Sequence, residues 1–285
     1  MKIAILGTEN SHARAFAQLI RDNAKYQDVE LIGVYGYDAE ANRALVDEGL
    51  APRAATSPDE FLGEVDGVVV TARHGALHRE YALPYVLAGV PAFIDKPFAI
   101  TQADITELID AAKASGALLC GGSSLKFLDE LNPLKRFVAK GGIVGGHVTA
   151  PVSMVNEYGG FYFYAQHLIE IMFAVFGSDI RSVCARRPDA AQNRVSAVFD
   201  YGDYDVTAQF YDAYTYTATV YSHEGCLSAV ARDVTYCYDI ELSEFCDMMR
   251  TGRMPEDYDR LARPARLLGL IERAYLEQRE VMVQW

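Results

Sequence analysis

Hydrophobic and polar positions follow two different periods along the chain. In the first 120 residues, short apolar runs alternate with stretches in which apolar residues recur every three or four positions. Short β-branched runs are typical of buried parallel strands, and the longer spacing is typical of amphipathic helices. The pattern predicts strands at residues 2–6, 29–35, 66–71, 92–95 and 117–120, and helices at 11–22, 39–48, 76–87 and 102–114.

This alternation predicts right-handed βαβ units and an α/β domain of the Rossmann type, a doubly wound parallel sheet over residues 1–122. The pattern changes after Gly121-Gly122. Helices are expected at 133–140, 161–176, 243–250 and 261–277, a glycine-rich turn at 141–146 precedes a strand at 147–155, and short alternating strands occupy 180–240. Residues 123–285 are therefore predicted to form an α+β domain with an open, largely antiparallel sheet.

Composition narrows the class of protein. The 285 residues are 51% hydrophobic and 23% charged, as in ordinary globular proteins of one or two domains. A net charge of −13 argues against nucleic-acid binding and against docking on an anionic membrane. The start of the chain does not fit a signal peptide, and no apolar run reaches the ~20 residues of a membrane span. Five scattered cysteines indicate reduced side chains and no metal site, so we expect a cytoplasmic protein.

Tyrosines are concentrated in the strands expected after residue 200. Tyrosine is enriched at subunit interfaces, so these strands predict a homo-oligomer formed through the C-terminal sheet. A half-exposed sheet with amphipathic side chains explains the same pattern equally well. The six residues are Tyr201, Tyr204, Tyr211, Tyr214, Tyr216 and Tyr221.

Lys96 follows the predicted strand at 92–95 and precedes Pro97. Ligands of open α/β sheets bind outside the carboxyl ends of the strands. A lysine there can hold an anionic or hydroxylated substrate, or exchange a proton when burial lowers its pKa. The alternative is a solvated lysine at a strand end, because lysines are mostly exposed.

The loop after the first predicted strand has the sequence GTENSH, residues 7–12. A Gly-x-Gly-x-x-Gly fingerprint at this place binds a diphosphate, but here only Gly7 is kept, and Glu9 and His12 take the other two positions. A carboxylate beside a diphosphate is unfavourable by ~1–4 kcal/mol at about 4 Å. The amides of the helix N-terminus still offer donors to an anion, and Asn10 or Ser11 can cap the helix.

Two further loops lie at the same edge of the predicted sheet. Gly36 stands where an enzyme that prefers NAD usually carries an acidic residue for the ribose. Asp38, two residues on, either replaces that residue or caps the helix that follows. After the strand at 66–71, His74 either contacts a ligand or is incidental, and His78 is expected to be a packing histidine.

A second proton-handling residue lies in the helix predicted at 161–176. His167 and Glu170 are three residues apart and share a helix face, so the carboxylate can orient or charge the imidazole. The alternative is a satisfied histidine in an apolar helix.

Over nearly its whole length the chain resembles the glucose–fructose oxidoreductase / inositol dehydrogenase / MocA family. The family's Glu-Lys-Pro appears as Asp95-Lys96-Pro97, and its Gly-x-His-x-x-Asp segment appears as residues 165–170. Lys126-Phe127 is similar to the family's Arg-Phe, which often faces substrate. Further matching features, all in family order, are the run at 66–71, His78, the segment Ala88-Gly89-Val90 and the helix that holds His167.

The resemblance implies an oxidoreductase that uses NAD or NADP and oxidises a secondary hydroxyl of a sugar, cyclitol or related polyol. It implies that Lys96 and His167 are catalytic, and that Lys126 and Tyr164 join them in binding substrate. The residues that it places around the cofactor are Gly7, Thr8, Asn10, Ser11, His12, Gly36, Ala72, Arg73, His74, Lys96 and Pro97.

The chain also departs from the family pattern. Phe163 occupies the position of an aspartate that usually lies four residues before the histidine. A carboxylate partner is then missing unless Glu157 or Glu170 replaces it, while a tyrosine, Tyr162 or Tyr164, can supply a hydroxyl instead. The departures leave two alternatives open: a non-redox member, acting as a metabolite sensor or partner subunit, and a lyase or hydrolase with transient redox.

Overall fold

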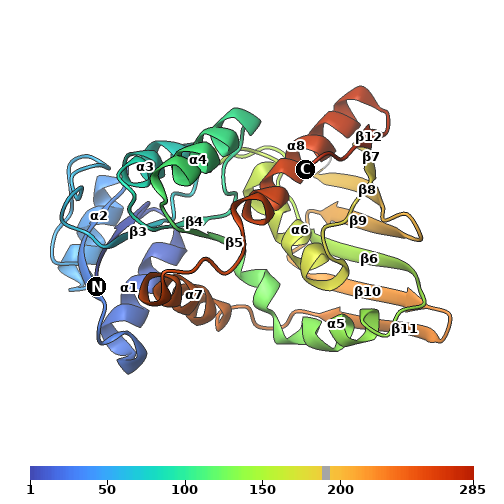
Figure 1. Cartoon of the computed structure of the whole chain (residues 1–285), viewed down its shortest axis with the longest axis horizontal. Coiled ribbons are helices and arrows are strands. Elements are labelled where there is room, and N and C mark those ends of the chain that lie inside the picture. The colour runs from blue at the N-terminus through green and yellow to red at the C-terminus, as the bar shows by residue number, and fades with distance from the viewer. Residues whose placement is uncertain (188–192) are drawn as a thin grey trace. The chain divides into compact units, whose positions relative to one another are not determined.

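The computed structural model describes residues 1–187 and 193–285. The chain divides into two compact units, shown in Figure 1. The first unit consists of Met1–Gly122 and Tyr238–Ala262, and the second consists of Ser123–Cys237 and Arg263–Trp285.

A five-stranded parallel sheet forms the centre of the first unit, as the strand–helix alternation predicted. The strand order is β2 (Glu30–Tyr35), β1 (Lys2–Leu6), β3 (Gly67–Val70), β4 (Ala92–Asp95) and β5 (Leu119–Gly122). The register pairs Asp95 with Gly122, so β4 and β5 end side by side at the carboxyl edge. The loops expected to carry the site therefore leave the sheet at one edge.

Helices cover both faces of this sheet (Figure 1). On one face, α1 (Ser11–Asp22) and α7 (Cys237–Thr251) pack on a core that includes Ile3, Ile5 and Phe93. The opposite face carries α3 (Ala76–Leu87) and α4 (Gln102–Ser115). The unit also contains α2 (Ala39–Asp47) and the short helix η1 (Ala24–Tyr26). With both faces covered, the strands are buried hydrophobic runs, as their sequences indicated.

Helix α7 corrects the predicted domain range, which placed all of residues 123–285 in the second domain. Its segment belongs to the first unit because Leu242, Phe245 and Met248 are buried in the core of that unit. The Phe245 ring meets the edge of the Phe93 ring from β4, with the ring centroids 6.3 Å apart. The helix also begins at Cys237, six residues before the predicted start.

The second unit contains a seven-stranded, largely antiparallel sheet, which confirms the predicted α+β fold. One pair, β6 with β9, is parallel, and the other pairs are antiparallel. The order is β11 (Gly225–Val230), β10 (Thr217–Ser222), β6 (Ile143–Pro151), β9 (Asp205–Tyr211), β8 (Arg194–Asp200), β7 (Ser182–Arg186) and β12 (Val281–Met282). The helical elements are η2 (Ser124–Phe127), η3 (Asp129–Leu131), α5 (Asn132–Val138), α6 (Tyr162–Phe176) and α8 (Tyr258–Glu277), the last of which begins in the first unit.

Strand β6 starts four residues earlier than predicted and ends at Pro151. The glycine-rich segment expected to be a turn is partly strand because Gly146 pairs in the sheet beneath a helix of the same unit. A Cβ at Gly146 would lie 2.3 Å from the Phe176 ring of α6. The glycine is therefore required by close packing.

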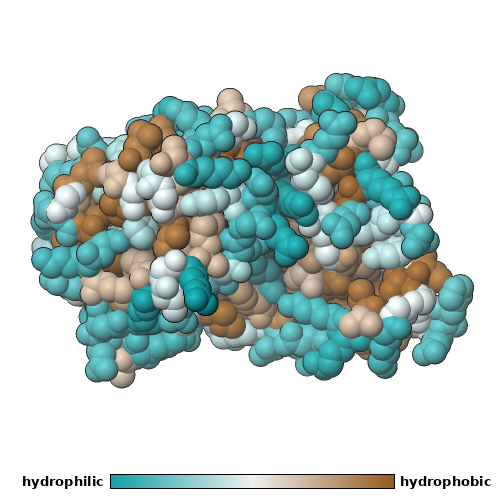
Figure 2. All heavy atoms as spheres, in the orientation of Figure 1, coloured by the Kyte–Doolittle hydropathy of each residue, from teal (hydrophilic) through white to brown (hydrophobic). Residues whose placement is uncertain are grey.

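The tyrosines of the second unit occupy several different surroundings. Tyr201 and Tyr204 stack on each other with centroids 5.3 Å apart, and Tyr216 is buried. Tyr211, Tyr214 and Tyr221 are exposed. Figure 2 shows hydrophobic side chains gathered over part of the seven-stranded sheet. Among the described residues, no helix is long and apolar enough to span a membrane.

Candidate functional site

Lys96 is buried at the carboxyl end of β4, with 6% of its surface exposed. This excludes the solvated lysine that the sequence left as an alternative. Burial lowers the pKa of Lys96, while the carboxylates of Asp95 and Glu241 act in the opposite direction. A lysine with a lowered pKa is better suited to exchange a proton near neutral pH than an exposed one.

Asp95 connects Lys96 to the loop that follows β1. Its Oδ2 atom lies 2.7 Å from Nδ1 of His12 and accepts a hydrogen bond from Nδ2 of Asn10 at 3.2 Å. Burial alone would raise the pKa of Asp95, but the imidazole of His12 and the ammonium of Lys96 bring it down to about 2. Asp95 is therefore a carboxylate inside a charged network.

Two departures from the family pattern meet in this network. His12 takes the third glycine position of the fingerprint, and Asp95 takes the place of the family's glutamate. The His12 ring is buried and lies against Asp95 and the Tyr238 ring, whose centroid is 4.6 Å away. The larger side chain at position 12 therefore has a polar partner and an aromatic neighbour of its own.

The turn between β1 and α1 is tight, and Gly7 is the residue that allows it. Gly7 has a φ of +115°, and a Cβ there would lie 2.1 Å from the amide nitrogen of Ala72. Asn10 caps α1 by accepting a hydrogen bond from the amide of His12 at 3.3 Å, while Ser11 is exposed. A tight turn that leads into a helix N-terminus suits the diphosphate of a dinucleotide.

Glu9 is directed toward the ends of β2 and β3, the two strands that flank β1. Its Oε1 atom accepts a hydrogen bond at 3.0 Å from the amide of Arg73, after β3. A Cβ at Gly36, after β2, would lie 2.8 Å from Oε2 of Glu9. The charge that argued against a diphosphate is thus engaged with the Arg73 amide. The turn and helix N-terminus fit a dinucleotide.

The side chains near the end of β2 have defined roles. Thr8 donates from Oγ1 to Oδ1 of Asn42 at 2.6 Å, and Asn42 donates from Nδ2 to the carbonyl of Gly36 at 2.8 Å. Asp38 caps α2, with Oδ1 accepting from the amides of Glu40 and Ala41. Of the two roles considered for Asp38, the structure shows the helix cap.

The histidines after β3 differ in burial. His78 is fully buried and lies 2.7 Å from the carbonyl oxygens of both Ala72 and Pro97. It therefore joins the loop after β3 to the loop after β4, as a packing histidine does. His74 is half-buried, and its Nδ1 atom accepts from the amide of Ala76 at 3.2 Å.

The second unit holds a separate polar cluster around His167 of α6. Nδ1 of the buried His167 lies 2.6 Å from the hydroxyl of Ser123, which directly follows β5. The Ser123 oxygen also accepts from the amide of Leu125 at 3.2 Å. Since that oxygen already accepts one bond, its own proton can go to Nδ1, which leaves Nε2 as the ring donor.

Glu170 is in contact with the backbone beside His167. Its Oε1 atom accepts from the Ser123 amide at 3.2 Å and from Nε2 of Gln166 at 3.1 Å. These contacts hold Ser123, and through it the ring of His167. Glu157, the other carboxylate considered as a replacement for the missing aspartate, is exposed.

The remaining predicted substrate residues lie near these elements of the second unit. Phe163, at the aspartate position, is buried against Tyr164 and Tyr158, with centroids 4.5 and 5.1 Å away. Tyr164 is half-buried, and its ring centroid lies 6.0 Å from that of His167. Lys126 in η2 is half-buried, with its ammonium 5.1 Å from the Phe127 ring centroid.

Two polar residues of these clusters were missed from the sequence. Ser123 stands immediately after β5. A position directly after a parallel strand identified Lys96 as a candidate after β4, and the same criterion could have identified this serine. Glu241 is 1% exposed on α7 and lies one turn before the core residue Phe245. A carboxylate on the apolar face of an amphipathic helix was the available signal, but the predicted helix began two residues later.

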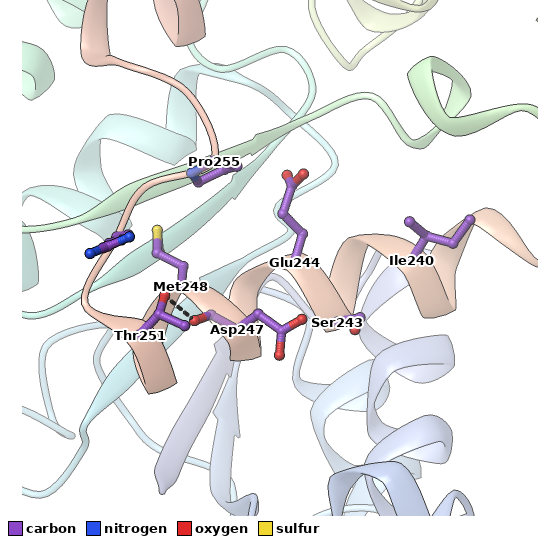
Figure 3. A pocket seen from close by; sticks show the side chains of 8 residues that line it. Ile240, Ser243, Glu244, Asp247, Met248, Thr251 and Pro255 are labelled. Carbon is purple, nitrogen blue, oxygen red and sulfur yellow. Dashed lines mark hydrogen bonds between the residues drawn. The ribbon is translucent and has the colours of Figure 1, made fainter. Parts of the chain in front are cut away.

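Two surface hollows of the first unit do not contain these residues. One, of about 330 Å³, is lined by α7 and the segment after it, including Glu244 and Asp247 (Figure 3). The other, of about 440 Å³, lies beside α1 and β2. The described part of the chain has no cluster of three or more metal-ligating side chains.

The parallel sheet, the glycine turn and the capped α1 define a Rossmann-type nucleotide-binding domain. Residues 1–122 match the family described as "Oxidoreductase family, NAD-binding Rossmann fold". Over this domain the match agrees with the glucose–fructose oxidoreductase / inositol dehydrogenase / MocA family that the sequence motifs predicted.

Curated relatives match the chain over part of their length. The scyllo-inositol 2-dehydrogenase (NADP(+)) IolU of Bacillus subtilis (strain 168) is 27% identical over 162 residues, 56% of this chain and 48% of that protein. The 1,5-anhydro-D-fructose reductase of Ensifer adhaerens is 29% identical over 116 residues, 40% of this chain and 34% of that protein. The chain thus aligns with half or less of these relatives.

Solved structures share the fold over the whole chain. GenD2 from gentamicin A biosynthesis, in complex with NAD, has a TM-score of 0.85 at 18% identity, covering 100% of this chain and 97% of that one. The myo-inositol 2-dehydrogenase from Lactobacillus plantarum has a TM-score of 0.85 at 16% identity, covering 100% of this chain and 99% of that one. These matches cover the whole chain and show that each unit has the same fold as in those structures. They therefore extend the fold assignment beyond residue 122.

Proposed function

We propose that this protein is an NAD(P)-dependent oxidoreductase that acts on a secondary hydroxyl of a sugar, cyclitol or related polyol. The observation that carries the proposal is Lys96, a buried lysine of lowered pKa at the carboxyl end of β4. Its position coincides with the lysine of the family motif, in a domain that matches an NAD-binding family. Relatives named as acting on inositols and anhydro-sugars support the substrate class.

Each candidate catalytic residue has a distinct role in the proposal. Lys96 donates a hydrogen bond to the reacting hydroxyl and helps to carry its proton, since burial makes its charged form less favourable. His167 positions the same oxygen or exchanges the proton through Nε2, because Ser123 occupies the Nδ1 side. Nicotinamide, when bound, supplies the hydride acceptor. Lys126 and Tyr164 are proposed to contact the remaining hydroxyls of the substrate.

The cofactor contacts are proposed at the carboxyl edge of the parallel sheet. The backbone of the Gly7 turn and of the loop from Ala72 to His74 would hold the dinucleotide, together with Lys96 and Pro97. Three side chains of the predicted set support the loop itself: Thr8 binds Asn42, Asn10 caps α1 and contacts Asp95, and His12 also contacts Asp95. Ser11 and Gly36 complete the set.

Binding and turnover test the proposal separately. Calorimetric titration should show binding of NAD or NADP at sub-millimolar concentration. A panel of inositols, hexoses and anhydro-sugars should then yield reduced nicotinamide with at least one member. Absence of binding for both cofactors at millimolar concentration would contradict the proposal and favour the non-redox alternative. Exchange of isotope at a substrate carbon without net reduced cofactor would favour the lyase or hydrolase alternative.

We further propose a homo-oligomer formed through the seven-stranded sheet, in a cytoplasmic setting. The exposed Tyr211, Tyr214 and Tyr221 support this surface as the contact. Light scattering at micromolar concentration tests it, with a monomeric mass as the contradicting result. Replacing Tyr221 by Glu should shift an oligomer toward monomer.

A further inference from the structure

The end of β2 lacks the carboxylate that an NAD-specific domain usually places there, because residue 36 is glycine. The structure also explains why this residue is small. A Cβ at Gly36 would lie 2.3 Å from Oγ1 and 2.8 Å from the amide nitrogen of Thr8. Since Thr8 is held by its bond to Asn42, a side chain at position 36 would require the turn after β1 to move.

Glu9 brings its carboxylate to the same place from a different strand. Its Oε2 atom lies 2.8 Å from the point where a residue-36 side chain would begin. Oε1 is fixed by the amide of Arg73, which orients the group. Oε2 is buried and has no hydrogen-bond partner among the residues that the structure describes. One oxygen is thus anchored while the other can accept a bond from a ligand.

The surrounding charges favour a hydroxyl over a phosphate as that ligand. Burial raises the pKa of Glu9, the Arg73 amide lowers it, and the nearby carboxylate of Asp38 raises it more than the Arg73 charge lowers it. The local field is therefore negative when both carboxylates are ionised. Such a field repels a phosphate of charge −1.5 to −2 but accepts the hydrogen bond of a neutral hydroxyl.

We propose that Glu9, from the turn after β1, replaces the usual acidic residue after β2 as the group that binds the adenosine ribose diol and makes the protein prefer NAD over NADP. The inference rests on the proposed dinucleotide binding. It gives the unusual residue at the second glycine position a function, and it names the cofactor that the sequence left undecided.

Cofactor fragments test the inference without turnover. Calorimetry on the whole protein would compare NAD with NADP, and AMP with adenosine 2′,5′-bisphosphate. We expect the 2′-phosphorylated member of each pair to bind about tenfold more weakly or worse, since a repulsion of one to a few kcal/mol corresponds to that factor or more. In Glu9→Gln, the ratio should fall toward one in both pairs, because Gln keeps an acceptor for the Arg73 amide without the charge.

Two control variants separate this role from general charge effects. Glu40→Gln removes an exposed carboxylate from the first turn of α2 and should leave both ratios unchanged. Asp38→Asn keeps an acceptor for the α2 amides and should change the ratios less than Glu9→Gln. A larger change in Asp38→Asn would overturn the assignment to Glu9.

The remaining outcomes distinguish this inference from the proposed function. If wild-type protein binds NADP as tightly as NAD, or if Glu9→Gln leaves the ratios unchanged, the inference fails and dinucleotide binding stands. If neither dinucleotide nor either fragment binds, both fail. An equal loss of affinity for both members of each pair in Glu9→Gln would show that Glu9 only supports the loop, and would overturn the inference.

Discussion

The polar clusters around Lys96 and His167 are built from different interactions. In the first unit, Lys96 is surrounded by charges, including those of Asp95 and Glu241, and its properties depend on how these balance burial. In the second unit, His167 is held by a hydroxyl and by amides, through Ser123 and the contacts of Glu170. The comparison teaches that electrostatics sets the pKa of Lys96, whereas hydrogen bonds set the ring orientation and the tautomer of His167.

The largest effect on turnover is expected from removing the ammonium group of Lys96. Lys96→Met should lower turnover by about 1,000-fold or more, because it removes the proposed proton carrier. NAD affinity should change much less, since the backbone contacts of the Gly7 turn remain. Initial rates and calorimetry on the same preparation measure both. Lys113→Met, which removes an exposed lysine paired with Asp259, serves as the control. Equal turnover in both variants would contradict the role of Lys96.

Removing the imidazole is expected to have the next largest effect. His167→Asn should reduce kcat by about 100-fold, because the variant can keep a contact with Ser123 but cannot exchange a proton near neutral pH. The pH profile of kcat/KM should also lose one limb. A variant with unchanged pH dependence would show that His167 is only a core residue.

The charged network around Asp95 in the first unit should make the free energy of unfolding depend on pH in the acidic range. The folded pKa of Asp95, about 2, lies below its ordinary value of 3.8, so its stabilisation is full above the ordinary value and is lost as the pH falls through 3.8 toward 2. The difference corresponds to about 2 kcal/mol. Urea unfolding across this range should show a steeper loss for wild type than for Asp95→Asn.

An exposed carboxylate provides the control for that measurement. Asp110 lies on the solvent side of α4, so Asp110→Asn should keep the acid dependence of wild type. Identical curves for all three proteins would show that Asp95 is not stabilised by its neighbours.

The smallest effect is expected in the cluster around His167. Ser123→Ala removes the partner of His167 and the acceptor for the Leu125 amide, so it should cost about 1 kcal/mol of stability and lower kcat/KM about fivefold. The pH profile separates the two effects, because a changed tautomer balance shifts its midpoint. Ser228→Ala, in the exposed strand β11, should change neither quantity. A lower stability with an unshifted profile would leave Ser123 a purely structural role.

The sequence predicted the parallel domain more closely than the second one. Buried parallel strands are continuous apolar runs with sharp ends, so β1 and β4 were placed to the residue. In the second unit, Gly146 looked like part of a turn, because its contact with Phe176 depends on an element thirty residues away. A tertiary contact of that kind leaves no local signal.

The same reasoning separates the predicted site residues from the missed ones. Lys96 could be found because the sequence shows both a side chain that can exchange a proton and its position directly after a predicted strand. The orientation of Glu9 could not, since it depends on which strands flank β1 in the sheet, and Glu241 was missed because the helix predicted there began after it. The substitutions at positions 12 and 95 looked like two independent losses, and only their contact of 2.7 Å reveals them as partners.

The contribution of α7 to the first unit has a consequence for the order in which the protein is made. A ribosome completes all five strands of the parallel sheet more than a hundred residues before it reaches Leu242 and Phe245, which cover one face of that sheet. Until then the nascent domain exposes apolar surface that includes Phe93. A fragment ending at Gly122 should therefore aggregate or recruit chaperones, and a gene fusion that exchanges only the first 122 residues would separate a sheet from its own cover.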